Sequence, residues 1–106
     1  MLRECRHENV VLYYGSCFHG ENLWVLTELC AGGSVRDLID TLGAGELPET
    51  VISYVLAQTL RGLVYLHQRH TVHGDIKAGN LLIGAGGVVK LADFGMARRL
   101  QPGAAE

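Results

Sequence analysis

The 106-residue sequence lacks the features that would assign it to several broad classes of protein. No apolar run approaches the roughly twenty residues that a membrane-spanning helix needs, and the N-terminus shows no signal-peptide pattern. The net charge is −2, so the composition gives no basic surface for nucleic acid or for an anionic membrane. We therefore expect neither nucleic acid nor a membrane among its partners.

Cysteine is also scarce, and its arrangement excludes a disulfide framework. Cys5, Cys17 and Cys30 are odd in number and widely spaced, and they include no Cys-x-x-Cys pair. The five histidines show no spacing to each other or to cysteine that suits zinc. This usage is typical of reduced thiols, so we expect a cytoplasmic protein.

Glycine is plentiful, but the pattern of a glycine-rich phosphate-binding loop is absent. The 14 glycines nowhere form Gly-x-Gly-x-x-Gly, and the only glycine-rich segments are two short patches at 31–33 and 84–87. The second patch lies between two apolar runs, where a hairpin turn is favoured over a phosphate cradle.

Hydrophobic periodicity predicts a mixture of strands and helices. Runs rich in β-branched and aromatic residues predict strands at 10–14 and 23–27, with a turn at 19–22. Further strands are expected at 81–83 and 88–91. A capping-box pattern, Ser34-x-x-Asp37, predicts a short helix that ends near residue 42.

A long helix is expected over 48–70. Pro48 suits the first helical position. Apolar residues recur after it at helical spacing, which predicts a core-facing side made of Ile52, Val55, Leu56, Leu60, Leu63, Val64 and Leu66.

The segment from residue 73 to residue 95 is the most informative. It contains His73-x-Asp75-x-Lys77-x-x-Asn80, and Asp93-Phe94-Gly95 begins eighteen residues after Asp75. Taken singly these residues mean little, because loop Asp and Asn usually cap turns and a lone Lys is usually solvated. As a set at this spacing they resemble the catalytic loop and metal-binding triplet of eukaryotic protein kinases.

The resemblance implies the roles of four residues in phosphoryl transfer from ATP to a protein. Asp75 matches the aspartate that accepts the proton of the attacking hydroxyl, and Lys77 matches the lysine that steadies the γ-phosphate. Asn80 and Asp93 match the residues that hold Mg²⁺. A lysine two residues after the aspartate is typical of the branch that acts on Ser/Thr hydroxyls.

Residues 24–34 (WVLTELCAGGS) resemble the hinge of the Sterile-20-like and MAP kinase kinase kinase branches. On this match Thr27 is the gatekeeper, and the backbones of Glu28 and Cys30 hydrogen-bond to adenine, whose edge carries a donor beside acceptors.

The resemblance extends to the rest of the nucleotide site and to the packing around it. Leu82 matches the apolar floor under the base, and Asp37 matches a ribose contact, although capping explains Asp37 equally well. The usual catalytic-loop arginine, which pairs with a phosphate on the activation segment, is replaced by Gly74, so control by that phosphate is in question. Four positions match the residues that stack to align the two lobes of the family: Leu2, Tyr13, His73 and Phe94.

The match covers the middle of the family's domain. Residues 7–11 resemble the loop that enters the fourth strand of the small lobe, and only six residues precede them. The only two lysines, Lys77 and Lys90, lie downstream, so neither suits the third-strand lysine that pairs with the α- and β-phosphates. We expect an α+β, partial protein-kinase-like fold in one incomplete domain over 1–106. Its small-lobe strands and hinge would occupy 1–30, and the start of the large lobe would occupy 31–106.

Two functions from different classes fit this sequence. One is a fragment of an ATP-dependent Ser/Thr protein kinase, inactive as this chain alone, whose partners are a protein substrate and possible scaffolds or upstream kinases. The other is a short non-catalytic module, derived from a kinase, that binds a kinase or a scaffold.

Overall fold

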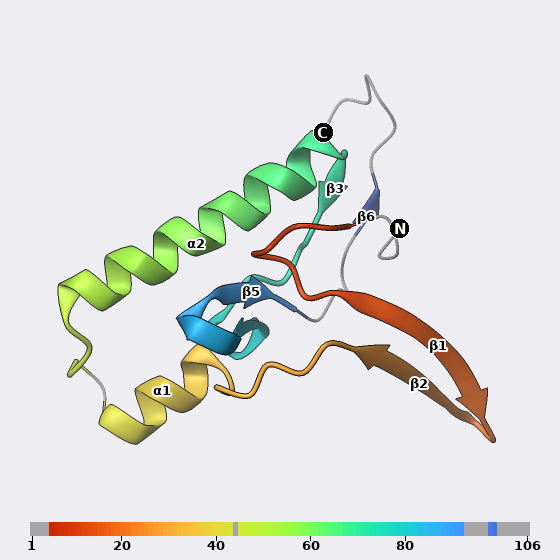
Figure 1. Ribbon diagram of the computed structural model, residues 1–106, viewed down its shortest axis with the longest axis horizontal. Helices are drawn as coiled ribbons and strands as arrows, with labels where there is room; N and C mark the ends of the chain where they lie inside the picture. Colours follow the sequence, from red (N-terminus) through yellow and green to blue (C-terminus); the bar gives the residue numbers. More distant parts are fainter. Residues whose placement is uncertain (1–4, 44, 93–97, 100–106) are drawn as a thin grey trace.

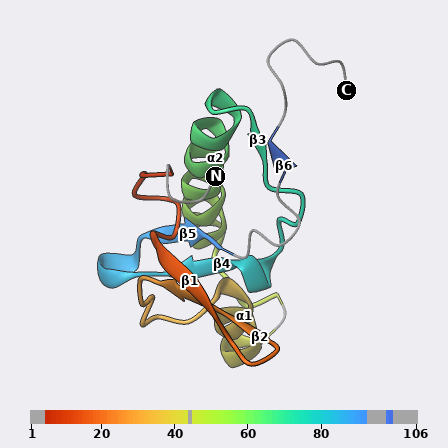
Figure 2. The same cartoon turned by 90° about the vertical axis from the view of Figure 1, so that its right-hand side faces the viewer.

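The computed structural model describes residues 5–43, 45–92 and 98–99, and these residues form the expected mixture of helices and antiparallel strand pairs. Helix α1 spans Val35–Leu42 and helix α2 spans Glu49–Gln68. The β4–β5 hairpin lies between the two helices, and the β1–β2 hairpin projects away from them (Figure 1). The view at 90° shows the same order of helix, hairpin and helix (Figure 2).

The projecting hairpin pairs β1 (Tyr13–His19) with β2 (Asn22–Thr27). Its turn lies where the sequence predicts it, with His19 opposite Asn22 and with Gly20 at φ 63°, a value that glycine adopts without strain. The second strand was placed correctly within one residue.

The prediction that the first strand begins at Val10 is wrong. Val10 and Val11 lie instead in a connection that runs beside Leu91, where the Val11 N–H donates to the Leu91 carbonyl at 2.9 Å. Both valines are buried there, whereas the large apolar side chains of the hairpin are mostly exposed. Burial therefore directs these β-branched residues to the core instead of to the hairpin.

The second hairpin pairs β4 (Leu81–Ile83) with β5 (Val89–Leu91). A 3₁₀ turn at Ala85–Gly87 joins them, which confirms that the second glycine patch forms a hairpin turn. Gly86 and Gly87 have φ values of 72° and 81°, a region that other L-residues rarely adopt.

Helix α1 begins as the capping-box pattern predicts. The Asp37 N–H donates to Ser34 Oγ at 3.1 Å, and the Ser34 N–H donates to Asp37 Oδ2 at 2.9 Å. Just before the helix, the Gly32 N–H donates to the Ile83 carbonyl at 2.9 Å. These bonds fix the start of α1 and the chain that precedes it against β4.

Helix α2 departs from the prediction in its bounds and in the side that is covered. Pro48 is the N-cap residue, so the helix begins one residue later than expected, and it ends at Gln68, two residues before the expected end. One side of the helix packs on β5, with Leu66 fully buried and with Val55 and Leu63 against the core. The four other predicted core positions are 42–58% exposed, because they lie on a second apolar side that no described element covers: Ile52, Leu56, Leu60 and Val64.

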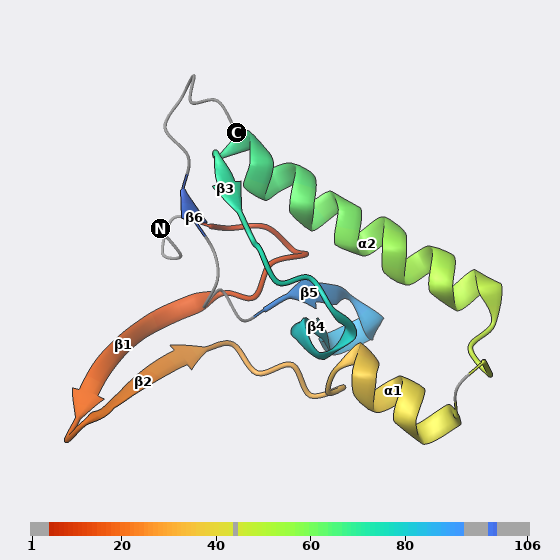
Figure 3. The ribbon, with the colours of Figure 1, turned by 180° about the vertical axis from the view of Figure 1, so that it is seen from behind.

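Strand β3 (Thr71–Val72) follows α2, pairs with β6 (Arg98–Arg99), and leads through a 3₁₀ turn (Ala78–Asn80) into β4, as seen from behind in Figure 3. The core lies where α2, α1, β4 and β5 meet. Its buried apolar members are Cys5, Val10, Val35, Leu66, Leu81, Val89 and Leu91.

Candidate active site

The predicted catalytic residues lie in the loop between β3 and β4. The loop starts at His73, whose exposed fraction is 1%, and ends at Asn80, which is also buried. Asp75 between them is partly exposed and Lys77 is exposed. A loop with buried ends can hold an accessible carboxylate in a fixed place, as a catalytic group requires.

The His73 ring joins the start of this loop to the end of β5. Its Nδ1 accepts the Asp75 N–H at 3.1 Å, and its Nε2 lies 2.7 Å from the Ala92 carbonyl oxygen. A carbonyl oxygen can only accept, so the proton must be on Nε2 and the ring is the neutral tautomer. The ring therefore fixes Asp75 relative to Ala92, the residue before Asp93.

Asn80 is bonded directly to Asp75. Asn80 Nδ2 donates to the Asp75 carbonyl at 2.8 Å and to Asp75 Oδ2 at 3.2 Å. The Asn80 carbonyl in turn accepts the Ala92 N–H at 2.9 Å. The structure thus brings together Asp75 and Asn80, and it ties both to the residue that precedes Asp93.

Lys77 also lies beside the carboxylate. Its Nζ is 3.7 Å from Asp75 Oδ2, with side chains 62% and 33% exposed, so the pair is weak and leaves the ammonium free to move. Gly74 next to it has φ 84°, where an arginine would be strained. This backbone conformation suits the glycine that replaces the usual arginine.

The remaining metal-binding candidate, Asp93, lies outside the described residues, as do Leu2 and Phe94. Among the described residues no group of three or more His, Cys, Asp or Glu side chains is arranged to hold a metal ion. Mg²⁺ needs fewer protein ligands, since it usually takes one or two side-chain oxygens together with phosphates and water. Asn80 fits that requirement, because its amide nitrogen is engaged by Asp75 and its amide oxygen makes no hydrogen bond to a described residue.

The predicted adenine-binding residues follow β2. The Glu28 N–H is already used, because it donates to the Leu12 carbonyl at 2.9 Å. The Glu28 carbonyl is approached only by the Thr27 hydroxyl, at 3.3 Å, and can therefore accept another hydrogen bond. The Cys30 N–H makes no hydrogen bond within the described part of the chain. One acceptor and one donor are thus available two residues apart, as an adenine edge requires.

Two further predicted residues border this segment. Leu82 is half-buried in β4, and a β-bridge joins it to Ser34, the last residue of the hinge-like segment 24–34. Asp37 forms the capping box through Oδ2, so its capping role is confirmed. Its contact with ribose stays a prediction.

Comparison with known families decides the assignment. Residues 1–105 match the family model described as the protein kinase domain. The chain belongs to the protein kinase domain family. Of the four positions predicted to stack, the structure describes two, of which Tyr13 is half-buried and His73 is buried, and the stacking itself stays a prediction.

The relatives of this kinase domain are Ser/Thr kinases. It is 46% identical over 101 residues to serine/threonine-protein kinase pakG of Dictyostelium discoideum, covering 95% of the chain and 8% of that protein. It is 43% identical to human mitogen-activated protein kinase kinase kinase kinase 3 over 94% of the chain and 11% of that protein. Identity to serine/threonine-protein kinase cst-1 of Caenorhabditis briggsae is 45%, over 94% of the chain and 20% of that protein. The Ser/Thr branch inferred from the sequence is confirmed, and the chain spans a fifth or less of these relatives.

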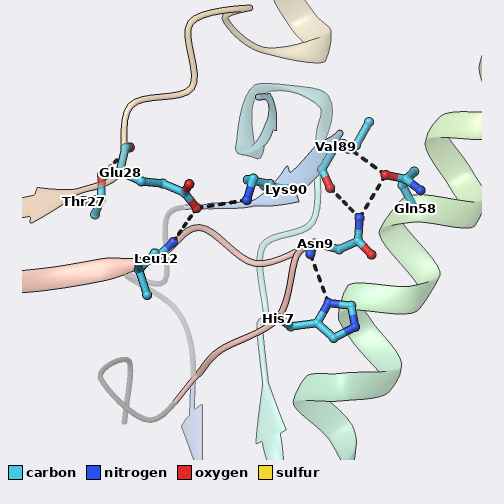
Figure 4. Close-up of polar contacts among 8 residues, drawn as sticks. All are labelled: His7, Asn9, Leu12, Thr27, Glu28, Gln58, Val89 and Lys90. Atoms are coloured by element: carbon cyan, nitrogen blue, oxygen red, sulfur yellow. Dashed lines mark hydrogen bonds and ion pairs between the residues drawn. The ribbon is translucent and has the colours of Figure 1, made fainter. Parts of the chain in front are cut away.

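Sequence reasoning missed two polar networks in this kinase domain. Glu28 Oε1 accepts from the Leu12 N–H at 2.8 Å and from Lys90 Nζ at 3.1 Å (Figure 4). Asn9 Nδ2 donates to Gln58 Oε1 at 3.0 Å and to the Val89 carbonyl at 2.9 Å. The partners are 16 to 80 positions apart, so no local pattern could pair them.

The Cys30 thiol lies close to the first of these networks. Burial raises its pKa above the ordinary value, the Glu28 carboxylate raises the pKa further, and the Lys90 ammonium partly opposes both effects. Cys30 therefore carries less thiolate than a free cysteine at the same pH.

Among the described residues, no helix combines the length and the apolar character needed to cross a membrane.

Proposed function

We propose that this chain is part of an ATP-dependent Ser/Thr protein kinase that transfers the γ-phosphoryl group of ATP to a hydroxyl of a protein. The observation that carries the proposal is the arrangement at Asp75. Asn80 bonds to its carbonyl and to its carboxylate, His73 accepts its N–H, and Lys77 lies 3.7 Å from Oδ2. Phosphoryl transfer depends mainly on such positioning and on charge.

The contacts of Asp75 and Lys77 suit the roles that we propose for them. Asp75, held by fixed neighbours but partly exposed, would accept the proton of the substrate hydroxyl. The exposed ammonium of Lys77 would steady the transferred γ-phosphoryl group, since it is a compact charge on a flexible stem.

Asn80 and Asp93 would hold Mg²⁺ through side-chain oxygens. When bound, the metal neutralises charge on the phosphates of ATP. On the protein side, the bond from the Ala92 N–H to the Asn80 carbonyl holds Ala92, the residue before the Asp-Phe-Gly triplet in the sequence, next to Asn80.

The nucleotide base would bind along the segment after β2. The Glu28 carbonyl and the Cys30 N–H supply the hydrogen bonds, Thr27 borders the base, and Leu82 lies under it. Asp37 would reach the ribose through the carboxylate oxygen that the capping box leaves free.

We place the small-lobe strands and hinge in residues 1–30 and the start of the large lobe in 31–106. We further propose that this chain alone does not catalyse transfer. Lys77 is beside Asp75 and Lys90 is paired with Glu28, which leaves no lysine for the α- and β-phosphates. Without that cation the barrier should rise by several kcal/mol. The small number of scattered cysteines, with no Cys-x-x-Cys pair, supports a cytoplasmic location.

The test uses the natural polypeptide that carries this chain, incubated with labelled ATP, Mg²⁺ and dephosphorylated casein. We expect Asp75→Asn to reduce transfer to serine and threonine by about 100-fold or more, because a general base contributes roughly 10²–10⁴-fold. Asp40→Asn is the matched control, since Asp40 lies in an exposed pair on α1, and it should leave transfer unchanged.

A parent polypeptide that transfers no phosphate but forms a stable complex with a kinase or a scaffold would refute the enzyme function. It would support the non-catalytic interaction module instead, for which the exposed apolar side chains of the β1–β2 hairpin offer a surface.

A further inference from the structure

The Glu28 side chain connects three segments that are far apart in the sequence. Its Oε1 accepts from the Leu12 N–H at 2.8 Å and from Lys90 Nζ at 3.1 Å, while its own N–H donates to the Leu12 carbonyl at 2.9 Å. Figure 4 shows the carboxylate between Leu12, ahead of β1, and Lys90 on β5. We refer to Leu12, Glu28 and Lys90 as the Glu28 clamp.

The ion pair of the clamp is largely removed from water. The side chains of Lys90 and Glu28 are 16% and 24% exposed, against 65% and 58% for the surface pair of Arg36 and Asp40. Water and salt screen a partly buried pair much less than an exposed one. Glu28 and Lys90 should therefore hold their geometry, whereas Arg36 and Asp40 should contribute little.

The stem of Lys90 is confined as well. A Cβ atom placed on Gly84 would lie 3.2 Å from Lys90 Cε, so the stem passes close over the turn between β4 and β5. This packing already restricts the rotamers of the Lys90 side chain. The ion pair with Glu28 therefore costs less side-chain conformational entropy to form.

The clamp acts on the residues to which the proposed function assigns adenine. The backbone carbonyl of Glu28 and the N–H of Cys30 are the proposed hydrogen-bonding groups. Two backbone bonds also tie this short segment: the Glu28 N–H donates to the Leu12 carbonyl at 2.9 Å, and the Gly33 N–H donates to the Cys30 carbonyl at a long 3.3 Å. The Glu28 carboxylate adds the side-chain restraint, since it joins the segment both to the Leu12 N–H and to Lys90 on β5.

We propose that Glu28 and Lys90 are positioning residues that hold the adenine-binding segment 27–30 in its binding-ready conformation, through Leu12 and β5. The inference rests on the proposed function and deepens it. A protein whose binding-competent conformation is only partly populated binds its ligand more weakly, in proportion to the populated fraction. Release of the clamp should therefore weaken nucleotide binding although neither side chain contacts the nucleotide.

The first measurement is hydrogen–deuterium exchange of the natural polypeptide without nucleotide, followed by mass spectrometry of peptides that cover 26–33. Glu28→Gln and Lys90→Met should each speed exchange there, while peptides from α2 keep the parental rate. Lys90→Arg keeps the charge and the donor, so it should restore slow exchange. Asp40→Asn should change nothing. Parental exchange at 26–33 in both Glu28→Gln and Lys90→Met would overturn the inference.

The second measurement is the affinity for ADP with Mg²⁺ by calorimetry. We expect each single variant to bind about 5-fold more weakly, the change that the loss of one modest polar interaction produces. The double variant should be no weaker than the weaker single variant, because the two residues act through one contact. Unchanged or tighter binding would overturn the inference, since the clamp would then be neutral or would restrain the segment from binding.

The two proposals can fail separately. If the parent binds no adenine nucleotide, the proposed function is refuted. Faster exchange at 26–33 in both variants would then still support the clamp as the restraint on this segment, and unchanged exchange would refute the clamp as well.

Discussion

Asn80 holds Asp75 at two points, with its Nδ2 atom 2.8 Å from the Asp75 carbonyl oxygen and 3.2 Å from Asp75 Oδ2. One amide group therefore fixes both the backbone and the carboxylate of the proposed base. The 3₁₀ turn at Ala78–Asn80 makes this possible, because it reverses the chain between Lys77 and β4. The loop geometry is set before any substrate binds, so the catalytic group does not lose further conformational freedom when the substrate binds.

This contact predicts the effect of Asn80→Asp. The change keeps the shape of the side chain but replaces a donor with an acceptor that faces two oxygens of Asp75. We expect the free energy of unfolding at pH 7 to fall by about 2–3 kcal/mol, because the new carboxylate at this buried position would face two oxygens of Asp75 without a donor. Urea denaturation measures the change, and Asn22→Asp in the exposed turn of the β1–β2 hairpin is the matched control.

His73→Phe tests the link between the loop and β5. Phenylalanine fills a similar volume but leaves the Asp75 N–H and the Ala92 carbonyl without their ring partners. We expect a loss of about 2–4 kcal/mol in the free energy of unfolding, since each unpaired buried group costs about 1–3 kcal/mol.

His19→Phe makes the same chemical change on the exposed hairpin and should stay within about 0.5 kcal/mol of the parent. A similar small effect for His73→Phe would contradict the assigned ring contacts.

Gly62→Ala should reverse the usual preference of a helix. In most helices alanine is favoured over glycine by about 1 kcal/mol. Here a Cβ atom would lie 2.8 Å from the Asn9 carbonyl oxygen and 2.9 Å from Leu91 Cδ1, so α2 would have to move off the core. We expect a net loss of about 1–3 kcal/mol by thermal or urea denaturation.

Gly79→Ala is the control for this comparison, because a Cβ atom there meets nothing within 4 Å and its φ is not positive. Stabilisation of the protein by Gly62→Ala would show that α2 does not pack this closely on Asn9.

The Cys30 thiol should titrate at a higher pH than a free cysteine. Burial and the Glu28 carboxylate both disfavour its thiolate, and the resulting rise in pKa moves the midpoint upward. The rate of alkylation by iodoacetamide follows the thiolate fraction, so its pH profile at Cys30 should reach half-maximum above that of the same cysteine in a short unfolded peptide. Peptide mass spectrometry resolves Cys30 from Cys17. A midpoint at or below that of the free thiol would contradict the assigned surroundings.

Local patterns predicted most of the elements. The capping box at Ser34, the hairpin turn at Gly20 and the glycine-rich turn before β5 all lie where the sequence places them, since each depends on residues within a few positions. The failures came from burial. Val10 and Val11 have the composition of a strand, but they pack beside Leu91. The periodicity of α2 could not show which of its apolar sides is covered.

In the candidate site, too, local contacts were predicted from the sequence and long-range contacts were not. Asp75, Lys77 and Asn80 lie within six residues of each other, and the structure brings them together as the motif predicts. The Glu28 clamp was not predicted, because Lys90 is 62 positions from Glu28 and no local pattern around either residue indicates its partner.

The sequence alone determined the family and indicated the residues of the proposed site, because fixed spacing within one short loop is a local property of the chain. Only the tertiary structure decided what holds that loop and the hinge-like segment in place. His73 reaches Ala92, and Glu28 reaches Lys90, across contacts that form when the β4–β5 hairpin packs between α1 and α2. Such contacts depend on which surfaces are buried against each other, and that outcome belongs to the whole fold.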